Sequence, residues 1–254
     1  MTAEHTAGLE LAGSRVLVTG GTSGIGFAIA RGFCEAGAQV VINGRDVDRG
    51  VTAVKELYGH PVTYIEGDMS NVDCVDRMVA ATVDQLGGLD VLVNNAGGSG
   101  RGTIENLDPD RWDYTMALNV RGPAFAMRAA LKALRASERG GCITNVTSIA
   151  GRDHPAGLGA YAASKAALNA LTVVAAKEEA RYGVRVNAVA PGLVETDMSA
   201  SLPEPVKAGL TKAIPLGRTM GTPEQVAGTC VFLATPAAGY ITGQVIAVDG
   251  GLRL

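Results

Sequence analysis

The sequence predicts an α/β fold in which a doubly wound, parallel sheet of about seven strands carries helices on both faces. Short apolar runs rich in β-branched residues recur along the chain, and segments with helical periodicity separate them. The runs lack polar alternation, which is typical of strands buried on both faces, and helical crossovers between parallel strands supply that cover. The runs are RVLVTGG, AQVVING, VTYIEGD, LDVLVNNAG, GCITNVTS, VRVNAVAPG and QVIAVDGG.

Helical spacing is clear in several of the intervening segments. Apolar residues recur at this spacing from Ile25 to Phe33, and Gly37 ends that helix. The nearly uncharged segment 225–248 contains Pro236 and several glycines, so it predicts a helix, a loop and a buried strand and not a membrane span. We expect further helices over residues 71–86, 109–135 and 161–181.

The composition restricts the class of protein. A chain of 254 residues with 47% hydrophobic content can build one large core, and no linker-like run divides it, so we expect one domain over 1–254. The net charge of -3 is spread without a basic stripe, which argues against nucleic-acid binding. The first fifteen residues lack the apolar core of a secretory signal, which predicts a cytoplasmic protein. Four cysteines lie far apart without metal-ligand spacing, so we expect neither a metal site nor a disulfide.

A glycine-rich loop joins the first predicted strand directly to a helix. Gly20 permits a tight turn, Gly24 lets the backbone approach a pyrophosphate, and Gly26 lets helix and strand pack closely. The same glycines would also suit a plain turn, but the strand-to-helix context favours a dinucleotide site in a Rossmann-type sheet. We expect cofactor contacts at Gly20, Thr22, Ser23, Gly24, Ile25 and Gly26.

The end of the second strand indicates which dinucleotide binds. Gly44 and Arg45 stand where an NAD site would place a carboxylate for the ribose hydroxyls. A guanidinium can bind a 2′-phosphate through two charge-assisted hydrogen bonds, which favours NADP. Asp46 could serve a ribose instead, so NAD stays possible, and Arg45 could also be a loop arginine paired with Asp46 or Asp48.

Three side chains suggest proton transfer beside such a cofactor. Tyr161 and Lys165 stand at i and i+4, on one face of a predicted helix. An ammonium together with an oxidised nicotinamide would favour the phenolate, so the pair could exchange protons near neutrality. Ser148 closes the fifth strand, and its hydroxyl can hold a carbonyl oxygen in the same crevice. Each residue alone would also suit a surface pair, a turn or a cap.

Taken together, these motifs resemble those of the short-chain dehydrogenase/reductase family over nearly the whole chain. Thr19 to Gly26 resembles the family's TGxxxGxG loop, and Asn94 to Gly97 its NNAG segment. Tyr161 to Lys165 resembles its YxxxK motif, with Ser148 thirteen residues before the tyrosine. Asn119, in Leu-Asn-Val, completes the family's tetrad.

The resemblance also implies a role for each member of the tetrad. Tyr161 would be the general acid in reduction and the base in oxidation, while Ser148 polarises the substrate oxygen. Lys165 would bind the nicotinamide ribose and lower the tyrosine pKa, and Asn119 would support a water that relays protons. Further cofactor contacts are implied at Asp68, Met69, Asn95, Ala96, Gly97, Pro191, Gly192, Val194 and Thr196.

The function that the resemblance implies is NADP-dependent interconversion of a ketone and a secondary alcohol, as in 3-oxoacyl-(acyl-carrier-protein) reductase-like members. An NAD(H)-dependent sugar, polyol or steroid alcohol dehydrogenase is the alternative within enzymes. A catalytically silent nucleotide-binding scaffold is the alternative from another class, although mere binding does not require the tetrad. The ending from Tyr240 to Gly251 resembles members that form homotetramers, and a homodimer is also open.

Substrate identity depends on loops that the motifs do not define. Reductases of carrier-bound substrates in this family often carry two docking arginines; Arg139 could be the first, whereas Tyr182 stands at the second position beside Arg181. We expect specificity to depend on His154 and Met198. The loops concerned are Gly98–Gly102, Arg152–Ala160 and Leu193–Ala213.

Overall fold

A computed structural model describes residues 11–253 and contains a seven-stranded sheet in which all neighbouring strands are parallel. The strand order is β3-β2-β1-β4-β5-β6-β7, so the winding direction reverses between β1 and β4. This confirms the predicted doubly wound fold. The strands are β1 (Arg15–Val18), β2 (Gln39–Gly44), β3 (Val62–Glu66), β4 (Val91–Asn94), β5 (Cys142–Val146), β6 (Arg185–Pro191) and β7 (Val245–Val248).

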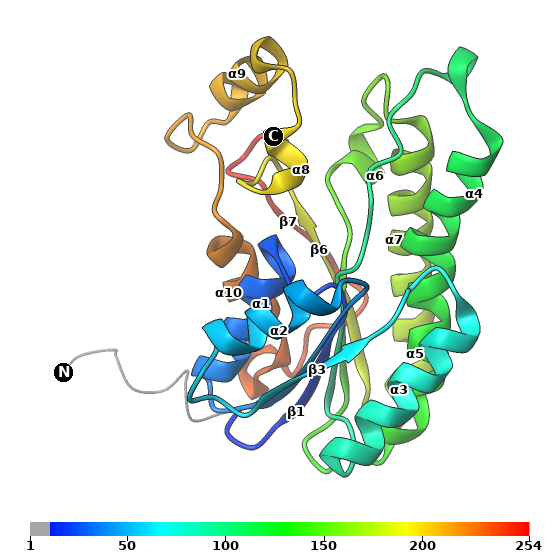
Figure 1. Cartoon of the computed structure of the whole chain (residues 1–254), viewed down its shortest axis with the longest axis vertical. Coiled ribbons are helices and arrows are strands. Elements are labelled where there is room, and N and C mark those ends of the chain that lie inside the picture. The colour runs from blue at the N-terminus through cyan, green and yellow to red at the C-terminus, as the bar shows by residue number, and fades with distance from the viewer. Residues whose placement is uncertain (1–10, 254) are drawn as a thin grey trace.

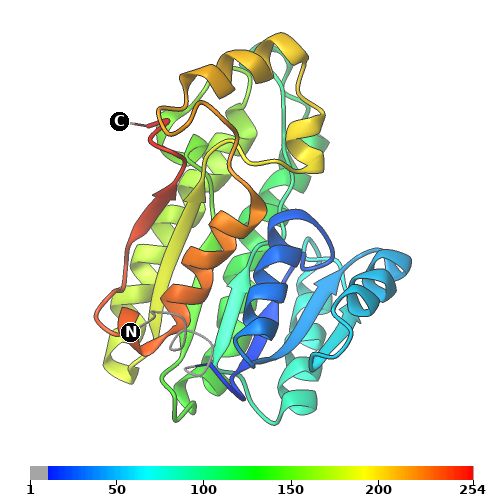
Figure 2. The same cartoon turned by 90° about the vertical axis from the view of Figure 1, so that its left-hand side faces the viewer.

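Two helical layers cover the sheet (Figures 1 and 2). Strand side chains alternate between them: Val16 and Val18 join the core under α1 and α10, whereas Leu17 joins the core under α3 and α5. Both faces are therefore buried, which explains the uninterrupted apolar runs. One layer holds α1 (Gly24–Glu35), α2 (Val47–Glu56) and α10 (Pro223–Ala234), and the other holds α3 (Val72–Leu86), α5 (Gly122–Arg135) and α7 (Gly159–Glu179).

Some elements differ from the sequence expectation. The helix expected over 109–135 is α4 (Pro109–Met116) followed by α5, and a π-helical segment, Ala117–Arg121, joins them. The helix expected over 161–181 begins two residues earlier and ends in a 3-10 turn, Ala180–Tyr182. The expectation of a buried last strand is wrong for this chain: β7 is the edge strand, pairs with β6 alone and is partly exposed.

A separate group of short helices lies beyond the carboxyl ends of the strands. They are α6 (Ala150–Asp153), α8 (Asp197–Ala200) and α9 (Glu204–Ala213). Figure 1 shows α8 and α9 above the carboxyl ends of β6 and β7; we call residues 197–213 the α8–α9 lobe. Remaining 3-10 turns are Ile104–Asn106 and Pro236–Ala238.

Among residues 11–253, no helix is long and apolar enough to cross a membrane. The expectation about a signal segment falls mainly on residues 1–10, which lie outside the described part of the chain.

Candidate active site

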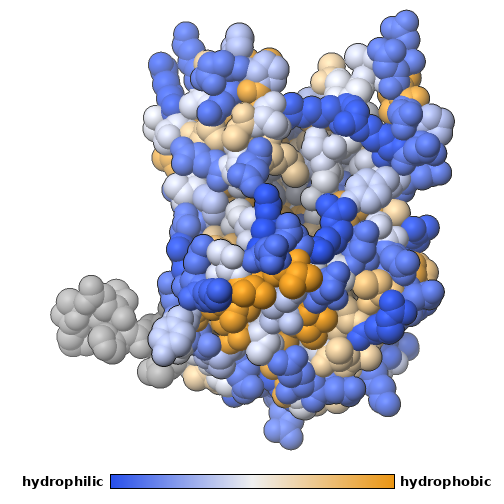
Figure 3. Space-filling view, viewed as in Figure 1, coloured by the Kyte–Doolittle hydropathy of each residue, from blue (hydrophilic) through white to orange (hydrophobic). Residues whose placement is uncertain are grey.

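A large cleft opens at the carboxyl ends of the strands, beside the reversal in strand order. Its volume is about 1510 Å³, above the ~300–1,000 Å³ usual for one drug-sized ligand, so a cofactor and a substrate both have room. In the space-filling view the molecule is hollowed between the α9 side and the α4 side (Figure 3). Of the residues expected to contact cofactor, all but Asp68 line this cleft.

The glycine-rich loop has the geometry that the sequence predicts. Gly20 and Gly24 adopt left-handed backbone angles, with φ of 63° and 52°. A Cβ on Gly26 would lie 2.1 Å from the Gly20 carbonyl oxygen, so only glycine allows the helix to approach the loop this closely. The loop and the start of α1 therefore pack as one close turn.

The N-terminus of α1 is open to the cleft. Its N-cap, Ser23, makes no side-chain hydrogen bond to the first turn, and that turn contains no acidic residue. By contrast, the side chain of Asp46 caps α2 by accepting from the Arg49 N–H. Uncapped N–H groups and the positive end of the helix dipole suit a bound pyrophosphate.

Hydrogen bonds join the glycine-rich loop to the segment after β4. The Thr19 hydroxyl oxygen accepts from the N–H groups of Asn95 and Ala96 at 3.0 and 3.1 Å. The Asn95 side-chain amide donates to the carbonyls of Thr19 and Gly20, both at 3.0 Å. Sequence reasoning did not assign Thr19 a role, although it opens the recognised motif.

Arg45 lies at the rim of the cleft and contacts a residue that the sequence did not single out. Its Nη1 donates to the Tyr114 hydroxyl of α4 at 2.5 Å. Within residues 11–253, no ion pair joins Arg45 to Asp46 or Asp48, so the pairing considered from the sequence is not formed. Arg49 also lines the cleft, and its guanidinium lies 3.8 Å from the Asp46 carboxylate and 4.0 Å from that of Asp197.

Asp68 and Met69 follow β3 but differ in their placement. Met69 is buried and lines the cleft. One carboxylate oxygen of Asp68 accepts from both the N–H and the hydroxyl of Ser70 at 2.8 Å, which makes a local turn. An adenine contact by Asp68 stays a prediction.

Asn119 lies in the π-helical segment and is fully buried. Its side-chain oxygen accepts from the Gly98 N–H, and its amide donates to the Gly98 carbonyl, each at 2.9 Å. The amide also donates to the Ser164 hydroxyl at 3.0 Å. Asn119 therefore holds the segment after β4 against α7, with Ser164 as a support that sequence reasoning missed.

Tyr161 and Lys165, the two members of the tetrad on α7, lie close together in the cleft. Lys165 is buried, and its Nζ lies 5.8 Å from the centroid of the Tyr161 ring. This Nζ donates to the Val146 carbonyl at the end of β5 at 2.9 Å. The Ser148 hydroxyl oxygen, two residues beyond that strand, accepts from the Ala150 N–H at 3.1 Å. All three side chains line the same cleft, as the motif spacing predicts.

Burial determines the direction of both pKa shifts at this site. It raises the pKa of Tyr161 above 10, and a hydrogen bond with the Ser148 side chain opposes that shift. It lowers the pKa of Lys165 from 10.5 to about 8. The expected stabilisation of the phenolate by the ammonium together with an oxidised nicotinamide stays a prediction. Tyr161 is a neutral phenol at pH 7, able to donate a proton.

The substrate loops contribute unequally to the cleft. Met198 lines it, whereas His154 does not and instead ends α6 in a left-handed conformation with φ of 53°. Leu252, near the end of the described chain, lines the cleft without having been expected. The neighbouring Arg253 forms an ion pair with Asp153 at 2.5 Å, which connects the C-terminal segment to α6.

The proposed docking positions lie at the other end of the sheet. Arg139 precedes β5, and its guanidinium donates to the Ala12 carbonyl at 2.9 Å. The ring of Tyr182 is contacted by the guanidinium groups of Arg135 and Arg181, at 4.1 and 4.7 Å from its centroid. These residues lie before the amino ends of β5 and β6, away from Ser148.

The structure also shows where the metal-ligating residue types and the cysteines lie. Across residues 11–253, no group of three or more His, Cys, Asp or Glu side chains could hold a metal ion. The four cysteines are free thiols: Cys34, Cys142 and Cys230 are buried and Cys74 is half-buried.

Comparison with known proteins is consistent with this geometry. A family model described as enoyl-(acyl carrier protein) reductase matches residues 20–253. The chain is 38% identical over 246 residues to the 3-oxoacyl-(acyl-carrier-protein) reductase FabG of Chlamydia pneumoniae, covering 96% of this chain and 98% of that one. It is 41% identical over 244 residues to a 3alpha-hydroxysteroid dehydrogenase of Mediterraneibacter gnavus, covering 93% and 96%.

A solved structure extends the likeness to three dimensions. A protein from Sinorhizobium meliloti 1021, proposed to be a short-chain alcohol dehydrogenase, superposes with a TM-score of 0.91 at 34% identity, covering 96% of this chain and 97% of that one. The likeness thus includes the sheet and both helical layers. The chain belongs to the short-chain dehydrogenase/reductase family of oxidoreductases.

Proposed function

We propose that this protein interconverts a ketone and a secondary alcohol with NADP, using Tyr161 as the general acid and base. The observation that carries the proposal is the convergence of Tyr161, Ser148 and Lys165 in one cleft with the open N-terminus of α1. A dinucleotide-binding scaffold without turnover would need only the second of these features.

The chain's own residues fit a nicotinamide dinucleotide. The uncapped first turn of α1 would hold the pyrophosphate, and Arg45 the 2′-phosphate. At Gly97 an added Cβ would come within 3.3 Å of Lys165 Nζ, so a side chain there would fill the space beside the ribose-binding ammonium. When bound, the nicotinamide donates a hydride to the substrate carbon or accepts one from it.

Proton movement would be the work of the tetrad. Ser148 orients the substrate oxygen, and the neutral Tyr161 phenol delivers a proton to it during reduction. Lys165 uses one donor on the Val146 carbonyl and keeps two for the ribose and the phenol. Asn119 holds the Gly98 backbone in place and would support the water through which the phenol is reprotonated.

Cofactor preference gives the first test. We expect NADPH to be used better than NADH, because each charge-assisted hydrogen bond from Arg45 to the 2′-phosphate is worth about 1.5–3 kcal/mol. Arg45→Asp should cut the NADPH-to-NADH ratio of kcat/KM by on the order of 10²-fold, and Tyr114→Phe should cut it less. Lys55→Glu, a comparable charge change at an exposed position on α2, is the control. Equal use of both cofactors by the parent enzyme would contradict the assignment.

The relatives support two substrate types within this reaction. A 3-oxoacyl thioester is supported by the 38% identity to the Chlamydia reductase, although Tyr182 replaces the second docking arginine. A steroid alcohol, used with either NADP or NAD(H), is supported by the 41% identity to the hydroxysteroid dehydrogenase.

Self-assembly is a further part of the proposal. Homodimers or homotetramers would cover the edge strand β7, which is partly exposed, and Tyr240, which is fully exposed in the single chain. Light scattering coupled to gel filtration gives the mass directly.

A further inference from the structure

The α8–α9 lobe presents a row of apolar side chains to the cleft. Met198, Leu202, Val206 and Leu210 recur at every fourth position, and all four line it. Val206 and Leu210 belong to α9, where this spacing places them on one helical face. Val206 and Leu210 are 48% and 39% exposed in the described chain, so apolar surface on this face is available to a ligand.

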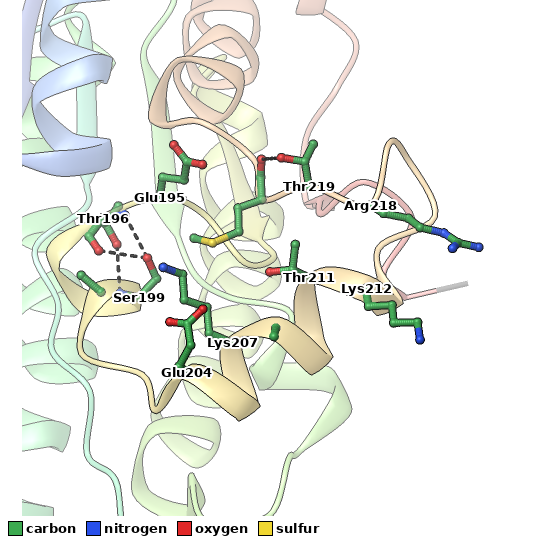
Figure 4. Close-up of a pocket in the computed structure, with 12 residues that line it drawn as sticks. Glu195, Thr196, Ser199, Glu204, Lys207, Thr211, Lys212, Arg218 and Thr219 are labelled. Carbon is green, nitrogen blue, oxygen red and sulfur yellow. Dashed lines mark hydrogen bonds between the residues drawn. The ribbon is translucent and has the colours of Figure 1, made fainter.

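The opposite side of α9 is polar. Glu204, Lys207 and Thr211 line a second, shallower cleft of about 640 Å³ behind the lobe. Figure 4 shows Lys207 directed toward Ser199 in that second cleft, while Lys212 points away from it. Helix α9 is therefore amphipathic: its apolar side faces the active-site cleft and its polar side faces the second cleft.

Further apolar residues extend this surface. Leu158, at the start of α7, and Leu252, at the C-terminal segment, line the same cleft as Ser148 and Tyr161. Polar residues also line the cleft, and one of them, Asp153, is paired with Arg253. A ligand that reaches the tetrad thus extends along apolar side chains.

From this arrangement we infer that the substrate is a ketone or secondary alcohol carrying an extended apolar group, which lies against Met198, Leu202, Val206 and Leu210. The inference rests on the proposed function and specifies its substrate class. A polyhydroxylated sugar or polyol does not fit this wall, because its hydroxyls would lose water without gaining hydrogen-bond partners. Burial of the four side chains by the substrate supplies the binding free energy instead.

A homologous series of methyl ketones tests the substrate class. The parent enzyme is assayed with NADPH on 2-butanone, 2-hexanone, 2-octanone and 2-decanone, and on the hydroxylated ketone erythrulose. We expect kcat/KM to rise up to about fourfold for each methylene that contacts the wall. A flat series, or erythrulose as the best substrate, would overturn the inference while leaving the proposed reaction intact.

Loss of turnover on every ketone would instead count against the proposed function. Calorimetric titration of the NADP-bound protein with 2-decanone and with erythrulose then decides the inference by itself. Preferential binding of 2-decanone supports the apolar wall, and equal or absent binding of the two ketones refutes it.

Variants on the two faces of α9 locate the effect. Val206→Ser with Leu210→Ser should lower kcat/KM for 2-decanone on the order of tenfold, and reduce it for 2-butanone by less. The matched control is Lys207→Ser with Ala208→Ser, which places two serines on the rear face of the same helix and should leave the chain-length dependence as in the parent. Thermal unfolding by circular dichroism verifies that both variants fold.

Light scattering tests one remaining alternative, in which the apolar row binds another copy of the chain and not the substrate. If the Val206→Ser, Leu210→Ser protein keeps the parent's chain-length dependence but changes its oligomeric mass, the apolar row is an interface between copies of the chain, and the inference is wrong. An unchanged mass with a flattened series supports it.

Discussion

Tyr161→Phe is expected to lose on the order of 10²–10⁴-fold in kcat while binding NADPH as the parent does. The phenol is the group proposed to exchange a proton with the substrate oxygen. A tyrosine hydroxyl with its ordinary pKa of about 10 is protonated at pH 7, and burial raises the pKa of Tyr161 further. Phenylalanine keeps the ring and removes the hydroxyl, and with it the exchangeable proton. Stopped-flow or steady-state kcat on a ketone whose chemical step limits turnover, with the NADPH dissociation constant from fluorescence, is the measurement.

Tyr58→Phe is the matched control for this change. Tyr58 is 92% exposed and lies outside the cleft, so loss of its hydroxyl should change neither kcat nor NADPH affinity. A Tyr161→Phe enzyme with near-normal turnover would show that another group is the acid. A parallel loss of NADPH binding would show that the hydroxyl mainly holds the cofactor.

Lys165→Met should have the second large effect. It should lower activity but should not lower the stability of the protein at pH 7. Turnover should fall on the order of 10²-fold or more and NADPH affinity should weaken, because the ammonium serves both the ribose and the phenol. The cofactor-free protein should nevertheless be at least as stable as the parent at pH 7. The pKa of Lys165 is lowered by burial from 10.5 to about 8, so holding it charged costs about 3 kcal/mol.

The pH dependence follows from the same shift. Below pH 8 the buried ammonium is charged and its full cost is present; between pH 8 and 10.5 the unfolded chain binds the proton and the folded chain does not, so the parent gains stability as the pH rises. The variant also loses the hydrogen bond from Lys165 to the Val146 carbonyl. This loss costs about 1–3 kcal/mol and offsets part of the stability that the variant gains by removing the buried charge. The difference in unfolding free energy between variant and parent should therefore move in the parent's favour from pH 7 to pH 9.5.

Thermal unfolding of both proteins without cofactor, at these two pH values, gives the comparison. Lys177→Met, an exposed lysine on the same helix, controls for removal of a charge and should change neither activity nor the pH trend. A Lys165→Met protein that is equally destabilised at both pH values would mean that the lysine is a structural residue only.

Much of the site was predictable because its signals are local. Helical geometry alone puts Tyr161 and Lys165 on one face, and the carboxyl ends of parallel strands bring Ser148 and the glycine-rich loop to the same edge. Gly20 is informative because its backbone is left-handed, and Gly26 because a Cβ there would lie 2.1 Å from the Gly20 carbonyl oxygen, six residues earlier.

Other features depend on contacts between segments far apart in sequence. The Val146 carbonyl that holds Lys165 belongs to the backbone and leaves no residue signature. Tyr114 reaches Arg45 only because α4 lies across the cleft from the end of β2. The apolar row of the α8–α9 lobe has helical spacing in the sequence, yet that spacing does not say which way the helix faces.

By itself, then, the sequence determined the order of strands and helices along the chain, the glycine turn, and which residues are proposed to transfer a proton. Only the tertiary structure decided the spatial order of the strands, the exposed edge at β7, and the burial that raises the pKa of Tyr161 and lowers that of Lys165. The physical reason is the distance along the chain over which each effect acts. Steric and helical patterns act over a few residues, whereas desolvation and packing depend on every segment that surrounds a group in the folded chain.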